Sequence, residues 1–172
     1  MLVDSIAGFG FEGPFASRPV YDPLIQAMSG LTTVQAGSDE ERPRLVRTIV
    51  PDKTTAITAA QAITAALLAR ERSGVGQHVQ LSMLASVVSF LWGSDMGSQT
   101  FAGHELPQQS AASFRDLVYE TKDGHFLSIS ASTPKIATRL FESISHGEMN
   151  EDQRFNNNEG RVNHRDIVDQ TV

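Results

Sequence analysis

The sequence of 172 residues contains no cysteine. This absence excludes disulfides, thiolate nucleophiles and cysteine-ligated zinc, and it is consistent with a reducing, cytoplasmic location. Positive charge is also scarce, because 14 Lys and Arg stand against 20 Asp and Glu, for a net charge of −6. Nucleic-acid binding needs clustered Lys and Arg, so we expect no nucleic-acid partner.

Long hydrophobic runs are missing as well. The longest apolar stretch, residues 56–69, is interrupted by Thr58, Gln61 and Thr64, so we expect no membrane span. The N-terminus lacks the basic and apolar segments of a signal peptide. The five histidines are scattered along the chain: His78, His104, His125, His146 and His164. No two of them have the spacing of metal ligands, and we expect no metal site.

The first half of the chain has the pattern of an α/β protein. We predict a strand over residues 2–7, a glycine-rich loop over 8–20 and a helix over 21–31. An alanine-rich segment predicts a long helix over 52–72, and alternating polar and apolar residues predict a strand over 78–82. Strand, long helix and strand in this order predict a βαβ unit with a parallel sheet.

Other segments carry weaker signals. Residues 33–44 are polar and turn-rich, and we expect residues 45–50 to be extended because Pro51 disfavours helix at Val50. A second apolar helix is predicted over 83–92.

The second half of the chain contains a strong hairpin signal. The dipeptide Asp123-Gly124 lies between alternating segments at 116–121 and 125–130, which predicts two antiparallel strands. A helix is predicted to open at Pro134. The tail is polar, and we expect residues 156–158 to lie outside regular elements.

Asp52 stands at the start of the long helix. An aspartate there is a natural N-cap, whose carboxylate accepts backbone N–H bonds and complements the helix dipole. The same carboxylate could act as a nucleophile, and the two roles are compatible because helix N-terminal donors favour the ionised form. Lys53 could also favour the ionised form of Asp52, or it could simply be solvated.

Two linked groups of residues resemble the class III CoA-transferase family, also called the CaiB/BaiF or formyl-CoA transferase-like family. The first group comprises residues 5–10, Gly13-Pro14, Arg18-Pro19, Tyr21-Asp22 and residues 26–31; the second comprises residues 52–55 and the helix that ends at residues 73–77. Asp52 is the only acidic residue between Pro43 and Arg70, so its match to the family's catalytic aspartate is unambiguous.

The resemblance implies a transfer reaction. Asp52 would attack an acyl-CoA thioester to form a mixed anhydride, and CoA would then attack to give an aspartyl-CoA thioester. An acceptor carboxylic acid would reverse these steps, so CoA is a substrate and no separate cofactor is expected.

The resemblance also implies two substrate-binding residues. Gly10 belongs to a loop that lines the family's active site, and Tyr21 would contact CoA or the acyl group. Alternatively, Tyr21 only packs on the sheet. The racemase branch of the family has a histidine at the Tyr21 position and an acidic residue in the segment aligned with 130–133. Tyr21 and Thr133 stand there instead, which disfavours an acyl-CoA racemase or dehydratase. The shielding glycine-rich loop found in many members would fall at 106–114, where this sequence is not glycine-rich.

The predicted fold class is therefore α/β, part of a Rossmann-like large domain followed by part of a smaller α+β domain. We assign residues 1–92 to the large domain, 93–113 to a linker or lid and 114–172 to the small domain. The resemblance predicts an interlocked homodimer and a longer protein, since most CoA nucleotide contacts would precede Met1. An alternative function is a catalytically inactive fragment that needs its missing half or a partner chain.

Overall fold

The computed structural model describes residues 1–37, 40–96, 117–131 and 133–172. The chain divides into two compact units, unit 1 (Met1–Phe114) and unit 2 (Arg115–Val172), and each is described by itself. Both units combine helices with a small sheet, so the predicted α/β class is confirmed. No helix in the described ranges is both long enough and apolar enough to cross a bilayer.

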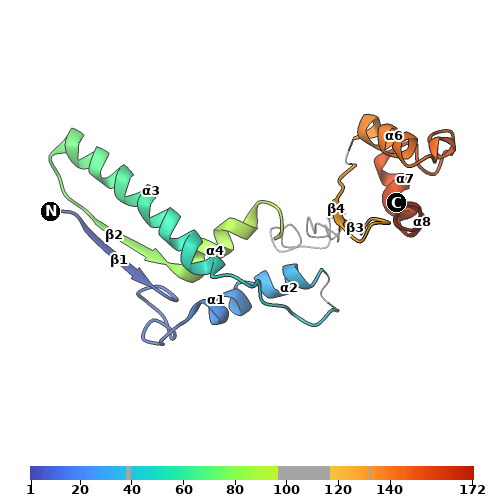
Figure 1. Cartoon of the computed structure of the whole chain (residues 1–172). Helices are drawn as coiled ribbons and strands as arrows, with labels where there is room; N and C mark the ends of the chain where they lie inside the picture. The colour runs from blue at the N-terminus through green and yellow to red at the C-terminus, as the bar shows by residue number, and fades with distance from the viewer. Residues whose placement is uncertain (38–39, 97–116, 132) are drawn as a thin grey trace, which may run out of the picture. The chain divides into compact units, whose positions relative to one another are not determined.

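Unit 1 is built on a parallel pair of strands. Strand β1 (Val3–Ala7) pairs with β2 (His78–Ser82) from Val3 opposite His78 to Ala7 opposite Ser82. The connection between them contains the long helix α3 (Val50–Ser73), which lies along the two strands (Figure 1). The predicted strand, helix and strand are therefore confirmed, with the parallel pairing that such a connection requires.

The predicted helix over 21–31 is confirmed as a shorter helix, and a second short helix that was not predicted follows it. Helix α1 (Asp22–Met28) ends before Gly30, and α2 (Leu31–Ala36) begins after it. Gly30 has a φ of +84°, a left-handed conformation that favours glycine, and its carbonyl accepts the first amide bonds of α2. The expectation of turns from residue 33 is wrong for α2.

The start of α3 also differs from the prediction. Residues 45–49 form no strand with any described residue, and Val50 is the first helical residue rather than an extended one. Pro51 occupies the second helical position, where its missing N–H costs no hydrogen bond. Ile49 is the N-cap, so Asp52 is the third residue of the helix and not its cap.

The core of unit 1 lies between short helices. Helix α4 (Met83–Trp92) confirms the prediction over 83–92, and the Ser82 hydroxyl caps it by accepting from the Ala85 amide. The buried cluster joins side chains of α1, α2 and α4: Ile25, Leu31, Val87 and Leu91. Helix α3 packs against α4 and β2 yet leaves apolar side chains exposed, among them Ile57, Leu67 and Leu68.

Unit 2 begins with the predicted hairpin. Strand β3 (Val118–Glu120) pairs antiparallel with β4 (Phe126–Ser128), and Gly124 in the turn has a φ of +78°. The predicted linker over 93–113 is described only to residue 96, and its remainder lies outside the described residues.

Four helical segments complete unit 2: α6 (Pro134–Ser143), the 3-10 helix η1 (Gly147–Asn150), α7 (Asn158–Asn163) and α8 (Arg165–Thr171). The buried core of unit 2 consists of side chains from α6, η1 and α8 and of Phe155 in the turn before α7: Ala137, Phe141, Met149, Phe155 and Val168. Asn158 was predicted to lie outside regular structure, but it begins α7. The reason is local, because the Asn157 side chain caps that helix by accepting from the Gly160 amide at 2.8 Å.

Candidate functional site

Asp52 lies in the first turn of α3 with its side chain exposed. Among the described residues, no hydrogen bond to its carboxylate is seen. A negative charge in this position is favoured by the dipole of the 24-residue helix. The site therefore presents an accessible carboxylate at the positive end of a long helix.

The first-turn amides of α3 are accounted for one by one. The Val50 amide donates to the Thr48 carbonyl at 2.9 Å, and Pro51 has no amide hydrogen. The Asp52 amide donates to Oδ2 of Asp22 at 3.2 Å. The next amide already donates to the carbonyl four residues back. A carboxylate from α1 thus satisfies the amide that the helix itself leaves unpaired.

Asp22 belongs to a buried polar network with Gln26, one turn later on α1. Asp22 is 5% exposed and Gln26 is 2% exposed. The Gln26 amide nitrogen donates to Oδ1 of Asp22 at 2.6 Å and to the Thr48 carbonyl at 3.1 Å. Its oxygen accepts from the Val46 amide at 2.9 Å. The network joins α1, the segment before α3 and the first turn of α3.

Replacing Gln26 with methionine should lower the free energy of unfolding of unit 1 by about 1–3 kcal/mol. Methionine fills a similar volume but leaves the Val46 amide and Oδ1 of Asp22 without their partner. The Thr48 carbonyl keeps its bond from the Val50 amide. The measurement is urea unfolding followed by fluorescence of the single tryptophan, Trp92, which lies in α4 of unit 1. Gln61→Met is the matched control because Gln61 is exposed on α3, and an equal loss there would contradict the network.

Tyr21 immediately precedes Asp22 and is the N-cap residue of α1. Its side chain is 81% exposed, so the interpretation that it packs on the sheet is wrong. Its predicted contact with CoA or the acyl group stays a prediction. Because Asp22 bonds to the Asp52 amide, the structure brings the backbone of Tyr21 close to the start of α3.

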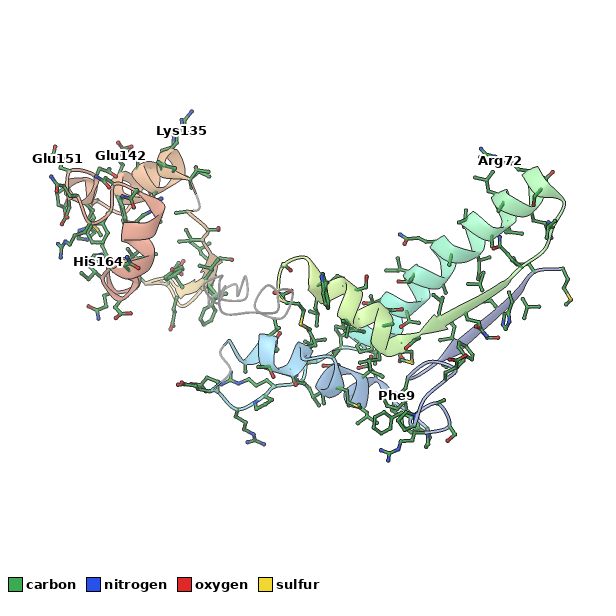
Figure 2. All side chains as sticks on the ribbon, turned by 180° about the vertical axis from the view of Figure 1, so that it is seen from behind. Phe9, Arg72, Lys135, Glu142, Glu151 and His164 are labelled. Atoms are coloured by element: carbon green, nitrogen blue, oxygen red, sulfur yellow. The ribbon has the colours of Figure 1, made fainter. Side chains whose placement is uncertain are left out.

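The loop after β1 returns to the same region. A Cβ on Gly8 would collide with Cγ1 of Val20, so the two ends of the loop meet, and Val20 precedes Tyr21. The loop is further ordered by ring contact between Phe9 and Phe15 at 5.7 Å between centroids, and Figure 2 shows Phe9 in this loop. Gly10 has a φ of +102°, which favours glycine. Its role in binding substrate stays a prediction.

Lys53 and Thr133 have local partners. The Lys53 ammonium donates to the Thr48 hydroxyl at 2.7 Å, so it is neither simply solvated nor bonded to Asp52. Thr133 caps α6 by accepting from the Ile136 amide. Within the described ranges, no group of three or more His, Asp or Glu side chains is arranged to hold a metal ion.

From the sequence, Asp22 and Gln26 stand out only as residues of the family motif, and no role is predicted for them. A signal was present, because residues 22, 25, 26 and 29 fall on one face of a helix. Ile25 marks that face as buried, yet three of the four positions are polar. Polar residues on a buried helix face require partners, and this requirement points to a network.

The family model for CoA-transferase family III matches residues 2–172. The chain belongs to CoA-transferase family III. A succinate–glutarate CoA-transferase of Agrobacterium fabrum is 32% identical over 175 residues, covering 100% of this chain and 43% of that protein. An acetyl-CoA:oxalate CoA-transferase of Acetobacter aceti is 28% identical, covering 98% of this chain and 43% of that protein.

Solved structures agree with this family assignment. A hypothetical protein of Mycobacterium tuberculosis has a TM-score of 0.81 at 28% identity, over 98% of this chain and 44% of its own. A CaiB/BaiF family protein from Brucella suis has a TM-score of 0.74 at 27% identity, over 99% and 45%. The chain therefore spans less than half the length of these relatives.

Proposed function

We propose that this protein transfers CoA from an acyl-CoA thioester to a carboxylic acid, with Asp52 as the covalent nucleophile and the CoA thioester as substrate. The observation that carries the proposal is the exposed Asp52 carboxylate in the first turn of α3. No other acidic residue lies between Pro43 and Arg70 of the family match.

The reaction has two balanced halves. A carboxylate oxygen of Asp52 attacks the thioester carbonyl, the C–S bond breaks, and a mixed anhydride and a CoA thiolate form. The thiolate then attacks the aspartyl carbonyl, which releases the donor acid as a carboxylate and leaves an aspartyl-CoA thioester. The acceptor carboxylate reverses both steps and leaves as its CoA ester. The thioester free energy is thus held on the enzyme throughout.

The described residues suggest how the neighbourhood supports these steps. The α3 dipole stabilises the negative charge on Asp52 between turnovers. The first-turn amides of α3 are already bonded, so donors for developing oxyanions must come from elsewhere. We assign the donation of hydrogen bonds to these oxyanions to the segment around Gly10 and to the exposed Tyr21, which lies next to Asp22 in the chain.

The substrate class follows from the relatives. Two of the proteins named above act, by their names, on succinate and glutarate or on oxalate, which are dicarboxylic acids. We infer a short dicarboxylic acid as one of the two acids exchanged. A longer protein and a homodimer are part of the same proposal, supported by the coverage of the relatives and by the exposed apolar side chains of α3.

Trapping of the intermediate tests the proposal directly. The chain is incubated with succinyl-CoA or acetyl-CoA, treated with hydroxylamine and digested with trypsin. Cleavage after Arg47 and Lys53 gives a peptide of residues 48–53 whose only acidic side chain is Asp52. We expect an aspartyl hydroxamate on this peptide, because both the anhydride and the thioester react with hydroxylamine.

The outcomes separate the alternatives. A hydroxamate on a different carboxylate would overturn the assignment of Asp52. No hydroxamate in a folded chain would favour the inactive-fragment alternative. Repeating the experiment with the chain extended to the length of its relatives then decides whether missing sequence or a missing activity is the cause.

A further inference from the structure

We propose that Asp22 is a positioning residue for the Asp52 nucleophile: its buried carboxylate holds the Asp52 main-chain amide and so fixes where the reactive side chain leaves α3. This inference rests on the proposed function, since it assigns a partner to the same nucleophile. Asp22 touches neither the reacting atoms nor the substrate in this scheme.

Both oxygens of Asp22 are committed to donors. Oδ2 accepts from the Asp52 amide at 3.2 Å, and Oδ1 accepts from the Gln26 side chain at 2.6 Å. The orientation of the Gln26 amide is fixed in turn, because its oxygen accepts from the Val46 amide while its nitrogen donates to the Thr48 carbonyl. Asp22 therefore has one arrangement that satisfies all partners, and it is buried in that arrangement.

Within α3, the first turn is held by the burial of Pro51 and by its own backbone bonds. Pro51 contributes no amide hydrogen, and the Asp52 side chain is exposed. The bond from Asp22 is thus the polar contact that ties the nucleophile's own backbone to another helix. A displacement of about 1 Å in a reacting group can lower a rate on the order of 100-fold, so this bond bears on reactivity as well as on stability.

The position of Asp22 in the chain adds to the argument. It directly follows Tyr21, the predicted contact for CoA or the acyl group, at the first residue of α1. One buried carboxylate thereby links the backbone of the substrate-contact candidate to the backbone of the nucleophile. A carboxylate that only capped α3 would not need to lie next to Tyr21 in the chain. Its removal would change only the free energy of unfolding.

Asp22→Asn is the decisive variant. Both partners of Asp22 are N–H donors, and an asparagine offers one acceptor oxygen and one NH₂ group, so one donor must face another donor. We expect the rate of hydroxamate formation on Asp52 to fall on the order of 10- to 100-fold in the folded variant. We also expect faster hydrogen exchange of the Asp52 amide, measured by NMR. Asp4→Asn is the control, since Asp4 is exposed on β1 and the charge change is identical.

Each outcome bears on a different claim. A wild-type labelling rate in folded Asp22→Asn would overturn the positioning role. Asp22→Ala leaves no acceptor at this position, so unchanged exchange of the Asp52 amide in that variant would overturn the contact itself, and this readout needs no catalysis. If Asp52 is labelled neither in this chain nor in the chain extended to the length of its relatives, the proposed function fails while the exchange measurement still decides the contact.

A second variant covers the case in which Asp22→Asn does not fold. Gln26→Met releases Oδ1 of Asp22 but leaves its bond to the Asp52 amide available. We expect labelling of Asp52 to slow several-fold relative to Gln61→Met. Equal labelling in these two folded variants would overturn the proposal.

Discussion

Replacing Asp52 with alanine should abolish CoA transfer while leaving unit 1 folded. The variant removes the only atoms that can form the anhydride and the thioester, so we expect a loss of transfer on the order of 10³-fold or more. The fold should survive because the tie to Asp22 uses the main-chain amide, which alanine retains. Alanine is also the strongest helix former, and the lost dipole interaction is worth about 0.3–1 kcal/mol.

The measurement combines two assays on the same preparation. Steady-state transfer is followed by the appearance of the new CoA ester, and unfolding is followed by Trp92 fluorescence in urea. Asp4→Ala is the matched control, because Asp4 is an exposed carboxylate of unit 1. Transfer near the wild-type rate in Asp52→Ala would eliminate covalent catalysis at this residue. A large loss in the free energy of unfolding of Asp52→Ala would instead assign Asp52 a structural role.

The elements that the sequence predicts correctly are those whose signals lie in neighbouring residues. Helix α3 follows from alanine content and from the glycine that ends it. Strand β1 follows from a short apolar segment and β2 from polar and apolar alternation, with a long crossover between them. One error arose where a glycine changed the path of the chain. Gly30 adopts a left-handed conformation that stops α1 and starts α2, and its presence near the predicted end gave no sign that a second helix follows.

The cap of α3 shows why part of the site was beyond local reasoning. An aspartate near a helix start predicts self-capping, but here the N-cap is Ile49, which has no polar side chain. The acceptor comes from Asp22, thirty residues earlier in the chain. Such a partner is set by how α1 packs, and no rule based on neighbouring residues identifies it.

The resemblance indicated Asp52, Tyr21 and Gly10 as site residues, and these assignments remain predictions. What the structure adds is their surroundings: an exposed carboxylate, an exposed tyrosine and a loop whose ends close on Val20. It also adds Asp22 and Gln26, which have hydrogen-bond partners that are distant in the sequence. Family motifs therefore name candidate residues, while packing and hydrogen bonds explain what holds them in place.

The second large effect concerns the packing beneath this network. Ile25→Ala should lower the free energy of unfolding of unit 1 by about 2–5 kcal/mol. Ile25 is 0% exposed and contacts the cluster of Val87, Leu91 and Leu31, so the deleted atoms leave a cavity where α1 meets α4. Urea unfolding followed by Trp92 fluorescence measures the change.

Leu24→Ala provides the control on the same helix, because Leu24 is 45% exposed and should cost far less. Equal losses at the two positions would show that the cluster is not the core that holds α1. Ile25→Ala also separates packing from polar positioning, since both bonds of Asp22 can persist in it. At temperatures where the variant is fully folded, Asp52 should therefore be labelled close to the wild-type rate, in contrast to Asp22→Asn.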